Sequence, residues 1–520
     1  MYNFPQLLQS ASFRFKSAAE MRSLSFYETR NKQGWFQEVD GMTLRPNSTV
    51  RHTLVMKFGG SSVGTAAAMA QVVQIVRAEK RRWHNVIVVT SALGGVTDLL
   101  LKMVQDVSAS EATFQADAGE LLQRHQQIAD ALIADEKQRG AVMREIGGLI
   151  DRVVNLCQAA SVLGETTPRV KDAVASTGER MCVRLLAAAL QTAGVKAEFV
   201  EATQLIRSDD HYTDAHPDLE ISFRLTRETL EPVLALGNVP VITGFIAATA
   251  QGTVTTLGRG GSDYSAALIG VALPADDVWI FTDVNGVMTA DPRLVPDAFT
   301  VPVCSYREVT ELAYYGAKVL HPKTIRPVIE AGIGLRVCNT FNPSHPGTRL
   351  VAELEQQRGV IKAITNIGGL QLVTVEGRGM LGVPGVAARA FDTVARLGTS
   401  VPLITQSSSE QSICFAVPAD ATARVLNNLT DAFAHEIFHR DIDRVWATEE
   451  VGIITVVGAG MKSTPGVSGR VFNALGEAGI NVIAIAQGSS EVSISLVVGA
   501  DEIRPALQVL HALILRPENP

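Results

Sequence analysis

The amino-acid sequence predicts an α/β protein with a largely parallel sheet sandwiched between helices, followed by two small αβ units that repeat one another. In the first two thirds of the chain, short apolar runs alternate with segments of helical periodicity. Several of these runs end in glycine-rich turns, as strands do where they lead into helices over a ligand site. Near the C-terminus, two segments repeat at a constant spacing.

The composition is that of a globular protein with several domains. Its 520 residues exceed the usual size of one hydrophobic core, and 46% hydrophobic with 19% charged residues suit a folded enzyme. A net charge of -7 without a basic block argues against a nucleic-acid partner. No stretch approaches ~18 consecutive apolar residues, so we expect no membrane span. The five scattered cysteines include no CxxC pair and indicate a reducing, cytoplasmic location.

Residues 1–52 differ from the rest of the chain. They carry seven basic and four acidic side chains, a net charge of +3, and the first part is rich in Ser and Phe. The segment lacks the apolar core of a secretory signal. We expect a poorly ordered extension, with an organelle-targeting peptide as the alternative.

The first elements after this extension form a strand–loop–helix–strand unit. Leu54–Phe58 is an apolar run closed by Gly59-Gly60, and residues 65–82 carry Ala, Val and Met at helical spacing. A second apolar run, Val86–Thr90, also ends in a turn that contains glycine. Such units build parallel sheets whose ligands bind at the carboxyl ends of the strands.

The following segments extend this domain, which we place at 53–351. Residues 110–165 predict long helices because apolar residues recur at three- and four-residue steps. A charged connector follows at 352–363. Further strands are expected at Ala197–Val200, Pro240–Thr243, Val278–Thr282 and Leu335–Val337.

The C-terminal part, 364–520, contains an internal repeat. Residues 373–391 match 454–472, and residues 404–417 match 485–498, each at an offset of 81 positions. Each copy predicts the order strand, glycine-rich turn, helix, strand, strand. A repeated small αβ unit after a catalytic domain indicates ligand sensing and not a second chemistry.

The glycine-rich loop after the first strand, residues 57–64, has the features of a phosphate site. Its glycines let backbone N–H groups approach a polyphosphate, and Lys57 adds a cation. It is not a Walker A loop, because the chain contains no Gly-Lys dipeptide. Taken alone, such a loop is also compatible with a purely structural turn.

A second glycine-rich loop, residues 256–264, favours the functional interpretation. It places Arg259, Ser262 and Asp263 among backbone donors at the start of an Ala-rich helix. Arginine suits a bidentate contact with a planar carboxylate. Two such loops, carrying Lys57 and Arg259 at one edge of a sheet, indicate a site for phosphate and carboxylate together.

Three further segments complete the candidate site, and each could also be a surface turn or a helix start. The strand and polar loop at 281–293 have the position where an adenine and a ribose would lie. Lys318 supplies a second cation for phosphate oxygens. Glu179 begins a helix, either as a functional acid or as a first-turn acid that complements the helix dipole.

In this order, the motifs resemble aspartate kinase of the amino-acid kinase superfamily. The resemblance covers about 53–350, and the repeat at about 364–513 resembles a tandem of ACT (βαββαβ) regulatory units. The motifs that carry it are KFGGSSVG (57–64), SALGGVTDLL (91–100), STGER (176–180), GFIAATAQGTVTTLGRGGSDYSAAL (244–268), TDVNGVMTADPR (282–293) and GAKVLHP (316–322).

The resemblance implies ATP and Mg²⁺ as cofactors and L-aspartate as the phosphate acceptor, and we assign no direct protein ligand to the metal. Met288 stands where the family often has a tyrosine near the nucleotide. The groups around ATP would be Lys57, Gly59, Gly60, Ser61, Thr282, Asp283, Arg293 and Lys318. The groups around aspartate would be Thr97, Glu179, Phe245, Arg259 and Ser262. The catalytic set would be Lys57, Lys318 and Asp263, the last orienting the lysines or a magnesium shell.

By the same resemblance, the reaction yields 4-phospho-L-aspartate and ADP, the first step toward lysine, threonine and methionine. The nucleophile is the substrate's own β-carboxylate, which is ionised at pH 7 because its pKa is about 3.9. No general base is needed, so catalysis is alignment plus neutralisation of charge by Lys57, Lys318 and Mg²⁺. We expect Arg259 to bind the α-carboxylate and Glu179 the α-ammonium group.

Two motifs are expected to carry no catalysis. Residues 377–382 match the GxGxxG dinucleotide pattern, but their counterpart in the repeat, 458–463, lacks the third glycine. A turn in the repeated unit explains both copies. Residues 435–439 match the HExxH zinc-protease pattern within an amphipathic helix at about 420–439, and we expect a solvated helix face there.

Each repeated unit carries a glutamine before a Ser-rich turn, Gln406 and Gln487. A buried amide suits a small amino-acid ligand, and an edge-strand glutamine satisfied by the backbone is the alternative. The two segments resemble those of threonine-sensitive aspartate kinases, including the kinase half of the fused aspartate kinase–homoserine dehydrogenases. We therefore expect feedback inhibition by L-threonine, a homo-oligomer formed through the ACT units, and no fused dehydrogenase. The rival functions are another carboxylate kinase, such as glutamate 5-kinase, and a non-catalytic amino-acid sensor.

Overall fold

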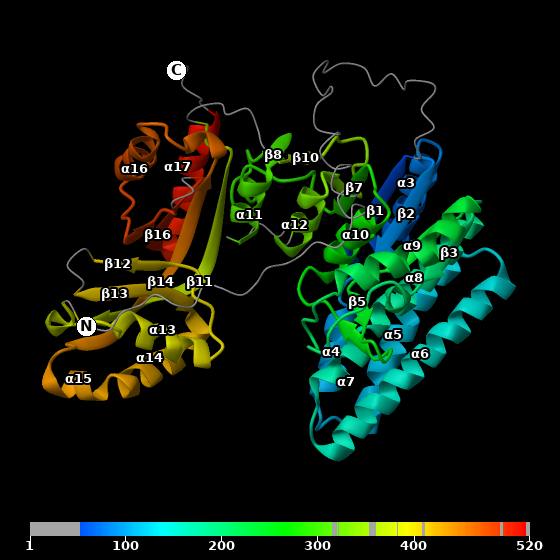
Figure 1. Ribbon diagram of the computed structural model, residues 1–520, viewed down its shortest axis with the longest axis horizontal. Helices are drawn as coiled ribbons and strands as arrows, with labels where there is room; N and C mark the ends of the chain where they lie inside the picture. Colours follow the sequence, from blue (N-terminus) through cyan, green and yellow to red (C-terminus); the bar gives the residue numbers. More distant parts are fainter. Residues whose placement is uncertain are drawn as a thin grey trace, which may run out of the picture. The chain divides into compact units, whose positions relative to one another are not determined.

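The computed structural model describes residues 52–314, 320, 322–352, 360–381, 383–407, 411–488 and 492–515. Three expectations lie outside these residues, namely the N-terminal extension, most of the connector, and Lys318. Most elements of the described part are labelled in Figure 1.

The larger sheet has eight strands within the described residues, in the order β3-β4-β2-β1-β7-β9-β10-β8 (Figure 1). Neighbouring strands are parallel except for β9 with β10. The largely parallel sheet predicted from the sequence is therefore confirmed. The strands are β1 (Thr53–Phe58), β2 (Asn85–Thr90), β3 (Ala197–Val200), β4 (Val239–Thr243), β7 (Asp277–Thr282), β8 (Val303–Ser305), β9 (Gly334–Asn339) and β10 (Thr348–Val351).

The central strands form because their residues are almost continuously apolar. Every residue of β1 and β2 is buried, as expected for parallel strands that are covered on both faces. Side chains alternate between the faces, so Leu54 and Met56 join one core cluster and Val55 joins the other. The six strands predicted for this domain are all present, with bounds within two residues of the expected ones.

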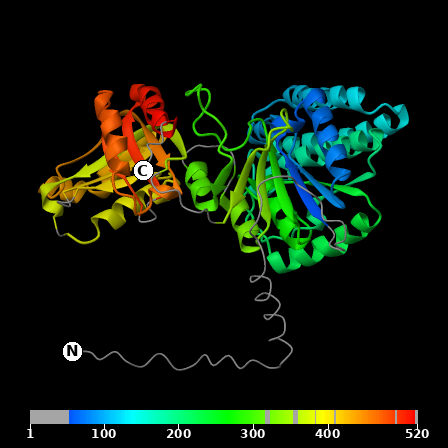
Figure 2. The same ribbon diagram turned by 90° about the horizontal axis from the view of Figure 1, so that it is seen from above.

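Helices cover both faces of this sheet, and Figure 2 shows the cyan helices together on one side of it. The long helices predicted over 110–165 are α5 and α6. The helices on the first core cluster are α3 (Ala66–Lys80), α4 (Val96–Gln105), α5 (Glu111–Leu132), α6 (Glu136–Leu163) and α8 (Thr177–Thr192). Those on the second are α9 (Leu219–Ala235), α10 (Gly261–Ala272), α11 (Tyr306–Tyr314) and α12 (Pro322–Glu330).

Helix α6 is long and apolar enough to cross a membrane by length and composition, and no other helix in the described residues is. Its residues Ile146, Leu149 and Ile150 lie in the same core cluster as Leu121 of α5 and Leu186 of α8. The apolar side of α6 is thus used to pack helices against one another.

The second sheet is antiparallel, with six strands in the order β12-β13-β11-β14-β16-β15. The predicted repeat is confirmed, because each copy contains a long strand, a turn, a helix and two strands in the same order, followed by another helix. The first copy consists of β11 (Ala363–Glu376), α13 (Val386–Arg396), β12 (Ile404–Gln406), β13 (Ser412–Pro418) and α14 (Ala419–Ala432). The second consists of β14 (Arg444–Val457), α16 (Val467–Glu477), β15 (Ala484–Ala486), β16 (Ser493–Gly499) and α17 (Ile503–Leu515).

The two copies share their longest strands. Residues 370–376 of β11 pair with β13 of the first copy, whereas residues 363–367 pair with the part of β14 that also pairs with β16. The register shifts between Ile367 and Leu370, where Gly369 has a φ of 69°. The first part of β11 therefore pairs within the second copy and the rest of β11 within the first copy, and the two units form one continuous sheet.

The GxGxxG motif forms a turn that includes the 3-10 segment Arg378–Met380, as the repeat predicted. A Cβ atom on Gly377 would lie 2.4 Å from the carbonyl oxygen of Asp441, and one on Gly379 would lie 2.6 Å from the Cα of Asp441. These glycines allow two chain segments to pack closely, which explains them without a dinucleotide. Gly382 lies outside the described residues.

The HExxH segment forms a separate short helix, α15 (Ala434–His439), and does not continue the helix expected to reach residue 439. The rings of His435 and His439 have centroids 4.3 Å apart, and Glu436 pairs with Arg389. Both imidazoles are exposed, so the expected solvated helix face is confirmed. Within the described part of the chain, no group of three or more His, Cys, Asp or Glu residues could hold a metal ion.

Candidate active site

The candidate site residues gather at the carboxyl edge of the larger sheet. Strand β1 ends at Phe58, β2 at Thr90, β4 at Thr243 and β7 at Thr282, and β1 is hydrogen-bonded to both β2 and β7. Because parallel strands end at the same edge, the loops that follow them meet there. The loops predicted from the sequence to bind ligands are therefore neighbours in space.

Lys57 and Asp263 form an ion pair at this edge. The Nζ atom of Lys57 lies 2.5 Å from Oδ1 of Asp263, without the alignment of a hydrogen bond. Lys57 belongs to β1 and Asp263 to the first turn of α10. Only 11% and 14% of the two side chains are exposed, so water screens the attraction weakly. The pair joins the two glycine-rich loops.

Glu179 is a buried acid in the first turn of α8, 3% exposed. Its Oε1 accepts a hydrogen bond from the N–H of Ala92 at 3.1 Å, and its buried Oε2 has no hydrogen-bond partner among the described residues. Burial raises the pKa of Glu179 to about 8, although the Ala92 N–H and the charge of Lys57 oppose the shift. A Cβ on Gly178 would lie 2.7 Å from that of Ala92, so glycine lets α8 come this close. A buried carboxylate with an open oxygen suits a cationic ligand.

Arg259 is exposed and stands between two glycines with positive φ, Gly258 at 70° and Gly260 at 75°. Side chains with a Cβ atom rarely adopt this conformation, which explains both glycines. The N–H of Leu257 donates to the carbonyl of Phe245 at 2.8 Å, and Gly260 is the N-cap of α10. The backbone therefore fixes the position of the Arg259 Cα, while the guanidinium group remains accessible to a ligand.

Phe245 follows β4 with a φ of 69°, which is uncommon for a residue with a side chain. Its N–H donates to Oγ of Ser265 at 3.1 Å. A Cβ on the preceding Gly244 would lie 2.6 Å from the Cβ of Ser262, so Ser262 packs directly on the strand end. Backbone strain of this kind collects at functional sites.

The first glycine-rich loop, predicted to bind phosphate, begins with Gly59 and continues into the short helix α2 (Gly60–Val63). The N–H of Gly94 donates to the carbonyl of Gly60 at 3.0 Å. A Cβ on Gly59 would lie 3.5 Å from Nζ of Lys57, and Ser61 is exposed. The loop thus lies against both the lysine and the loop that follows β2.

The loop between β2 and α4 leads into Thr97, which is half-buried in the first turn of α4. Gly95 is the N-cap of that helix with a φ of 77°. Arg124 of α5 donates to the carbonyl of Gly94. Arg124 was not predicted from the sequence, because a single arginine within a long helix belongs to no motif.

The groups expected near the nucleotide follow β7. The hydroxyl of Thr282 donates to the Asp283 carboxylate at 3.1 Å. Arg293 is exposed and pairs with Asp291, Nη2 to Oδ2 at 2.7 Å, and this hydrogen bond lowers the pKa of Asp291. Arg293 therefore already has an acidic partner of its own. Met288 is half-buried.

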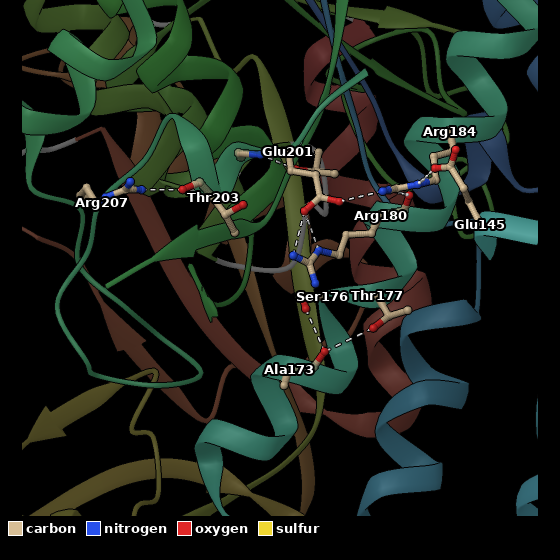
Figure 3. A network of polar contacts seen from close by, with 11 residues as sticks. Glu145, Ala173, Ser176, Thr177, Arg180, Arg184, Glu201, Thr203 and Arg207 are labelled. Carbon is tan, nitrogen blue, oxygen red and sulfur yellow. Dashed lines mark hydrogen bonds and ion pairs between the residues drawn. The ribbon is translucent and has the colours of Figure 1, made fainter. Parts of the chain in front are cut away.

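An ionic network, not predicted from the sequence, holds α8 in place (Figure 3). Glu201, just after β3, accepts hydrogen bonds from Arg180 at 2.9 Å and from Arg184 at 3.1 Å. Arg184 also pairs with Glu145 of α6 at 2.8 Å. Since Arg180 directly follows Glu179, the network fixes the turn of α8 that carries Glu179. Arg180 belongs to the STGER motif, but Glu201 is 21 positions away and belongs to no motif.

The second repeated unit contains a cavity of about 340 Å³ beside Gln487. Gln487 and its counterpart Gln406 are both exposed, so the buried amide expected from the sequence is not found. Gln406 ends the edge strand β12, and Gln487 directly follows the edge strand β15. The polar groups that line the cavity with Gln487 are Ser463, Thr464 and Ser468.

Models of known families match most of the chain. A model of the amino acid kinase family matches residues 52–339, and a model of the ACT domain matches residues 373–433 and 454–513. Aspartokinase 2, chloroplastic, of Arabidopsis thaliana is 33% identical over 468 residues, which cover 88% of this chain and 84% of that protein. The chain belongs to the aspartokinases of the amino acid kinase family. The resemblance inferred from the motifs is confirmed.

This aspartokinase chain is also similar to longer bifunctional proteins and to solved aspartokinase structures. The bifunctional aspartokinase/homoserine dehydrogenase 1, chloroplastic, of Zea mays is 35% identical over 471 residues, 88% of this chain and 50% of that protein. The chain thus spans about half the length of the bifunctional relatives that it matches. E. coli aspartokinase III in complex with aspartate and ADP has a TM-score of 0.75 at 29% identity, over 89% of this chain and 100% of that one. The structure of aspartokinase III in complex with lysine and aspartate has a TM-score of 0.72 at 30% identity, over 89% of this chain and 99% of that one.

Proposed function

We propose that this chain phosphorylates the β-carboxylate of L-aspartate with ATP, yielding 4-phospho-L-aspartate and ADP at the head of lysine, threonine and methionine synthesis. One observation carries the proposal. A buried acid with an open oxygen, Glu179 at the start of α8, and an exposed guanidinium, Arg259 on the loop before α10, lie near the Lys57–Asp263 pair at one sheet edge. The similarity to an E. coli aspartokinase whose structure holds aspartate and ADP supports it.

In this proposal the two charged groups on the α-carbon of aspartate are each held by a side chain of opposite charge. Arg259 binds the α-carboxylate, and Glu179 binds the α-ammonium group through its open Oε2. Thr97, Phe245 and Ser262 complete the substrate pocket. Because burial raises the pKa of Glu179 to about 8, the free protein holds a proton there at pH 7, and an arriving ammonium group favours its release.

The phosphoryl group is handled by cations and backbone donors. Lys57 and the loop of Gly59, Gly60 and Ser61 contact phosphate oxygens, and Asp263 orients Lys57 through their 2.5 Å contact. Lys318 acts as a second phosphate-binding cation, with Thr282, Asp283 and Arg293 near the nucleoside. The substrate carboxylate is ionised at neutral pH, so these groups serve alignment and charge neutralisation and no protein base is required.

Mg²⁺ fits this site as a partner of the nucleotide. No acidic cluster in the described residues could cage a metal ion, whereas magnesium with phosphates keeps several waters and needs only one or two carboxylates. Asp263 and Asp283 lie at the correct edge for that purpose. When bound, the ion supplies neutralisation of charge on the transferring phosphoryl group.

The repeated units are proposed to bind an amino-acid effector, L-threonine. The cavity of about 340 Å³ is large enough for a small amino acid, and Gln487, Ser463 and Thr464 offer donors and acceptors. The similarity to E. coli aspartokinase III, which was solved in complex with lysine and aspartate, supports an amino-acid effector. The edge strands β12 and β15 expose Ile404 and Ile485 and would pair copies of the chain into a homo-oligomer.

A coupled ADP-release assay with aspartate and glutamate as acceptors tests the activity. We expect turnover with aspartate, little with glutamate, and loss of about 10³-fold or more in Lys57→Ala. Equal rates with glutamate would favour another carboxylate kinase, and no turnover with either would favour a non-catalytic sensor. Titration with threonine and lysine then tests the effector, and inhibition by lysine alone would overturn the threonine assignment.

A further inference from the structure

Asp172 is a buried carboxylate that no proposed step of the reaction uses. It lies in α7 (Pro168–Ala175) and is 1% exposed. Its Oδ1 accepts a hydrogen bond from the hydroxyl of Thr256 at 2.7 Å, and its Oδ2 accepts from the N–H groups of Thr256 and Thr213, both at 2.9 Å. All three of these donors are neutral, so desolvation of the charge is only partly offset, and burial raises the pKa of Asp172.

The first partner of Asp172 leads to the loop of Arg259. Thr256 ends β6 (Val254–Thr256), which pairs with β5 (Ile246–Ala248), the strand that directly follows Phe245. Arg259 is three residues beyond Thr256. Two hydrogen bonds to one carboxylate therefore fix the residue from which the Arg259 loop departs.

The second partner holds a loop that packs under the same place. Thr213 has a φ of 75°, and its N–H points at Asp172. The next residue, Asp214, forms an ion pair with Lys323 at 2.5 Å. Asp214 also packs against Gly258, since a Cβ on Gly258 would lie 2.3 Å from Oδ1 of Asp214. Asp172 thus holds both the stem of the Arg259 loop and the segment beneath Gly258.

The other side of Asp172 leads to Glu179 through a stiff joint between helices α7 and α8. The N–H of Ser176 donates to the carbonyl of Asp172 at 3.0 Å, and the Ser176 and Thr177 hydroxyls both donate to the carbonyl of Ala173 (Figure 3). The network around Glu201 then fixes the first turn of α8 (Figure 3). Asp172 therefore hydrogen-bonds α7, which is joined to the start of α8 and Glu179, to the strand end from which the Arg259 loop departs.

We propose that Asp172 is a positioning residue that holds Glu179 and Arg259, the groups for the two substituents of the α-carbon, at a fixed distance from the phosphate site around Lys57, and thereby sets the length of amino dicarboxylate that the site accepts. The inference rests on the proposed roles of Glu179 and Arg259. Aspartate and glutamate differ by one methylene, so a shift of the Arg259 loop by about the length of one carbon–carbon bond alters which of them places its terminal carboxylate correctly.

The test compares Asp172→Asn with wild type in the full chain. Asparagine keeps the shape, but if its amide oxygen faces the two N–H donors its N–H₂ group faces the Thr256 hydroxyl, which must then accept instead of donate. The variant therefore loses the negative charge and the short hydroxyl-to-carboxylate hydrogen bond. We expect the KM for aspartate to rise by about tenfold or more, the KM for ATP to change by less than about twofold, and the aspartate-to-glutamate ratio of kcat/KM to fall. A uniform loss of kcat with unchanged KM values and ratio would overturn the proposal.

Substitutions of Thr256 provide a second, milder arm. Thr256→Val removes only the hydroxyl bond, so the KM for aspartate should rise by about threefold, whereas Thr256→Ser keeps that bond and should restore the wild-type value. The double variant Asp172→Asn with Thr256→Val should show less than the product of the single effects. The proposal would be contradicted if the increases in KM multiplied in the double variant, or if Thr256→Ser raised the KM as much as Thr256→Val. If Asp172→Asn does not fold, this arm decides.

Glu79→Gln is the matched control, since Glu79 is also a buried acid but contacts Arg82 and Trp83 at the end of α3. It should lower the Tm without changing the KM for aspartate or the selectivity ratio. The same changes in KM and selectivity in this control would show a purely structural effect. Failure of the proposed function is separate, because wild type would then give no aspartate-dependent ADP release at all.

Discussion

The Oε1 atom of Glu308 accepts a hydrogen bond from the backbone N–H of Ala459 at 2.7 Å. Glu308 lies in α11 beside the larger sheet, and Ala459 begins the turn of the second repeated unit that also contains Met461 of the cavity. Oε2 of Glu308 lies 3.2 Å from Nζ of Lys362. Burial opposes ionisation, but the hydrogen bonds from Ala459 and Ser305 and the charge of Lys362 lower the pKa of Glu308.

Lys362→Met should leave the buried Glu308 carboxylate without its cation. Removing one partner of a buried pair typically costs about 3–5 kcal/mol, so we expect a clear fall in Tm at pH 7. A lowered carboxyl pKa gives stability that is lost as pH falls through it. Without Lys362 that pKa rises, and acid unfolding should begin at higher pH. Arg224→Met, at an exposed pair with Glu228, should change Tm little, and equal effects of the two substitutions would refute this account.

Binding of aspartate should release about one proton per site at pH 7. The pKa of Glu179 is about 8 in the free protein, and the ammonium group of the substrate favours the ionised form. Calorimetric titration in two buffers with different ionisation enthalpies measures the released proton, which should disappear in Glu179→Gln. Persistence of the release in that variant would assign it to another group.

The ionised form of Glu179 should destabilise the folded chain at high pH while it favours aspartate binding. The folded chain holds a proton on Glu179 up to about pH 8, whereas the unfolded chain loses it near the ordinary glutamate pKa of 4.5. Stability therefore falls as pH rises through this window, by roughly 3–5 kcal/mol. Glu179→Gln should be more stable than wild type at pH 8 while binding aspartate more weakly. Glu165→Gln, on an exposed acid, is the control and should follow wild type in chemical unfolding at each pH.

His125 should make the protein sensitive to mild acid. Its Nδ1 donates to the carbonyl of Leu121 at 2.6 Å, and its buried Nε2 has no hydrogen-bond partner among the described residues. Burial lowers the pKa of His125 from 6.5 to about 4, so only the unfolded chain takes up a proton between these values. Stability is fully present above pH 6.5 and falls by about 3 kcal/mol as pH drops to 4.

Urea unfolding of His125→Leu at a series of pH values tests this origin. The difference in free energy of unfolding between the variant and wild type should shift in the variant's favour as pH falls from 6.5 to 4. The exposed His84, changed to Gln, should leave the wild-type profile unaltered. A His125→Leu profile that runs parallel to wild type would rule out His125 as the cause.

Gly244→Ala should damage the substrate side of the site. The added Cβ would lie 2.6 Å from Cβ and 2.9 Å from Cα of Ser262, so the first turn of α10 must move together with Asp263. We expect kcat/KM for aspartate to fall by about 10²-fold or more. Gly147→Ala meets no atom within 4 Å in the middle of α6 and should be neutral or stabilising by up to about 1 kcal/mol. Normal activity in Gly244→Ala would show that this contact is not needed.

The sequence predicted the parallel sheet and the repeat because both leave a periodic signal. Apolar runs such as Val86–Thr90 must be buried on both faces, and the constant spacing of the repeat reflects one fold used twice. It did not predict the antiparallel strand β10, or the exchange of strands at Gly369, because partner choice between strands depends on distant residues. Lys57 and Asp263 each belong to a motif, and their contact followed from strand ends meeting.

Asp172 and Glu201 show what sequence reasoning could not reach. Each is a single acid outside any motif, and its importance comes from partners that lie 84 positions away for Asp172 and 21 for Glu201. The exposure of Gln487 is a different failure. The residue type suggested a buried amide, but Gln487 directly follows the edge strand β15 and is exposed. The motifs predict the residues of the candidate site, whereas the structure shows which other residues position them through hydrogen bonds.

Gln487→Ala should weaken the response to L-threonine more than Gln406→Ala. Gln487 lines the cavity of about 340 Å³, and alanine removes the amide while leaving the hydroxyls of Ser463 and Thr464. Loss of one or two hydrogen bonds to a small polar ligand typically costs about 1–3 kcal/mol, which is roughly a ten- to hundredfold loss of affinity. The rise in Tm with increasing threonine gives the affinity of each variant without relying on kinase activity. A Gln406→Ala variant that loses more affinity than Gln487→Ala would place the effector in the first repeated unit instead.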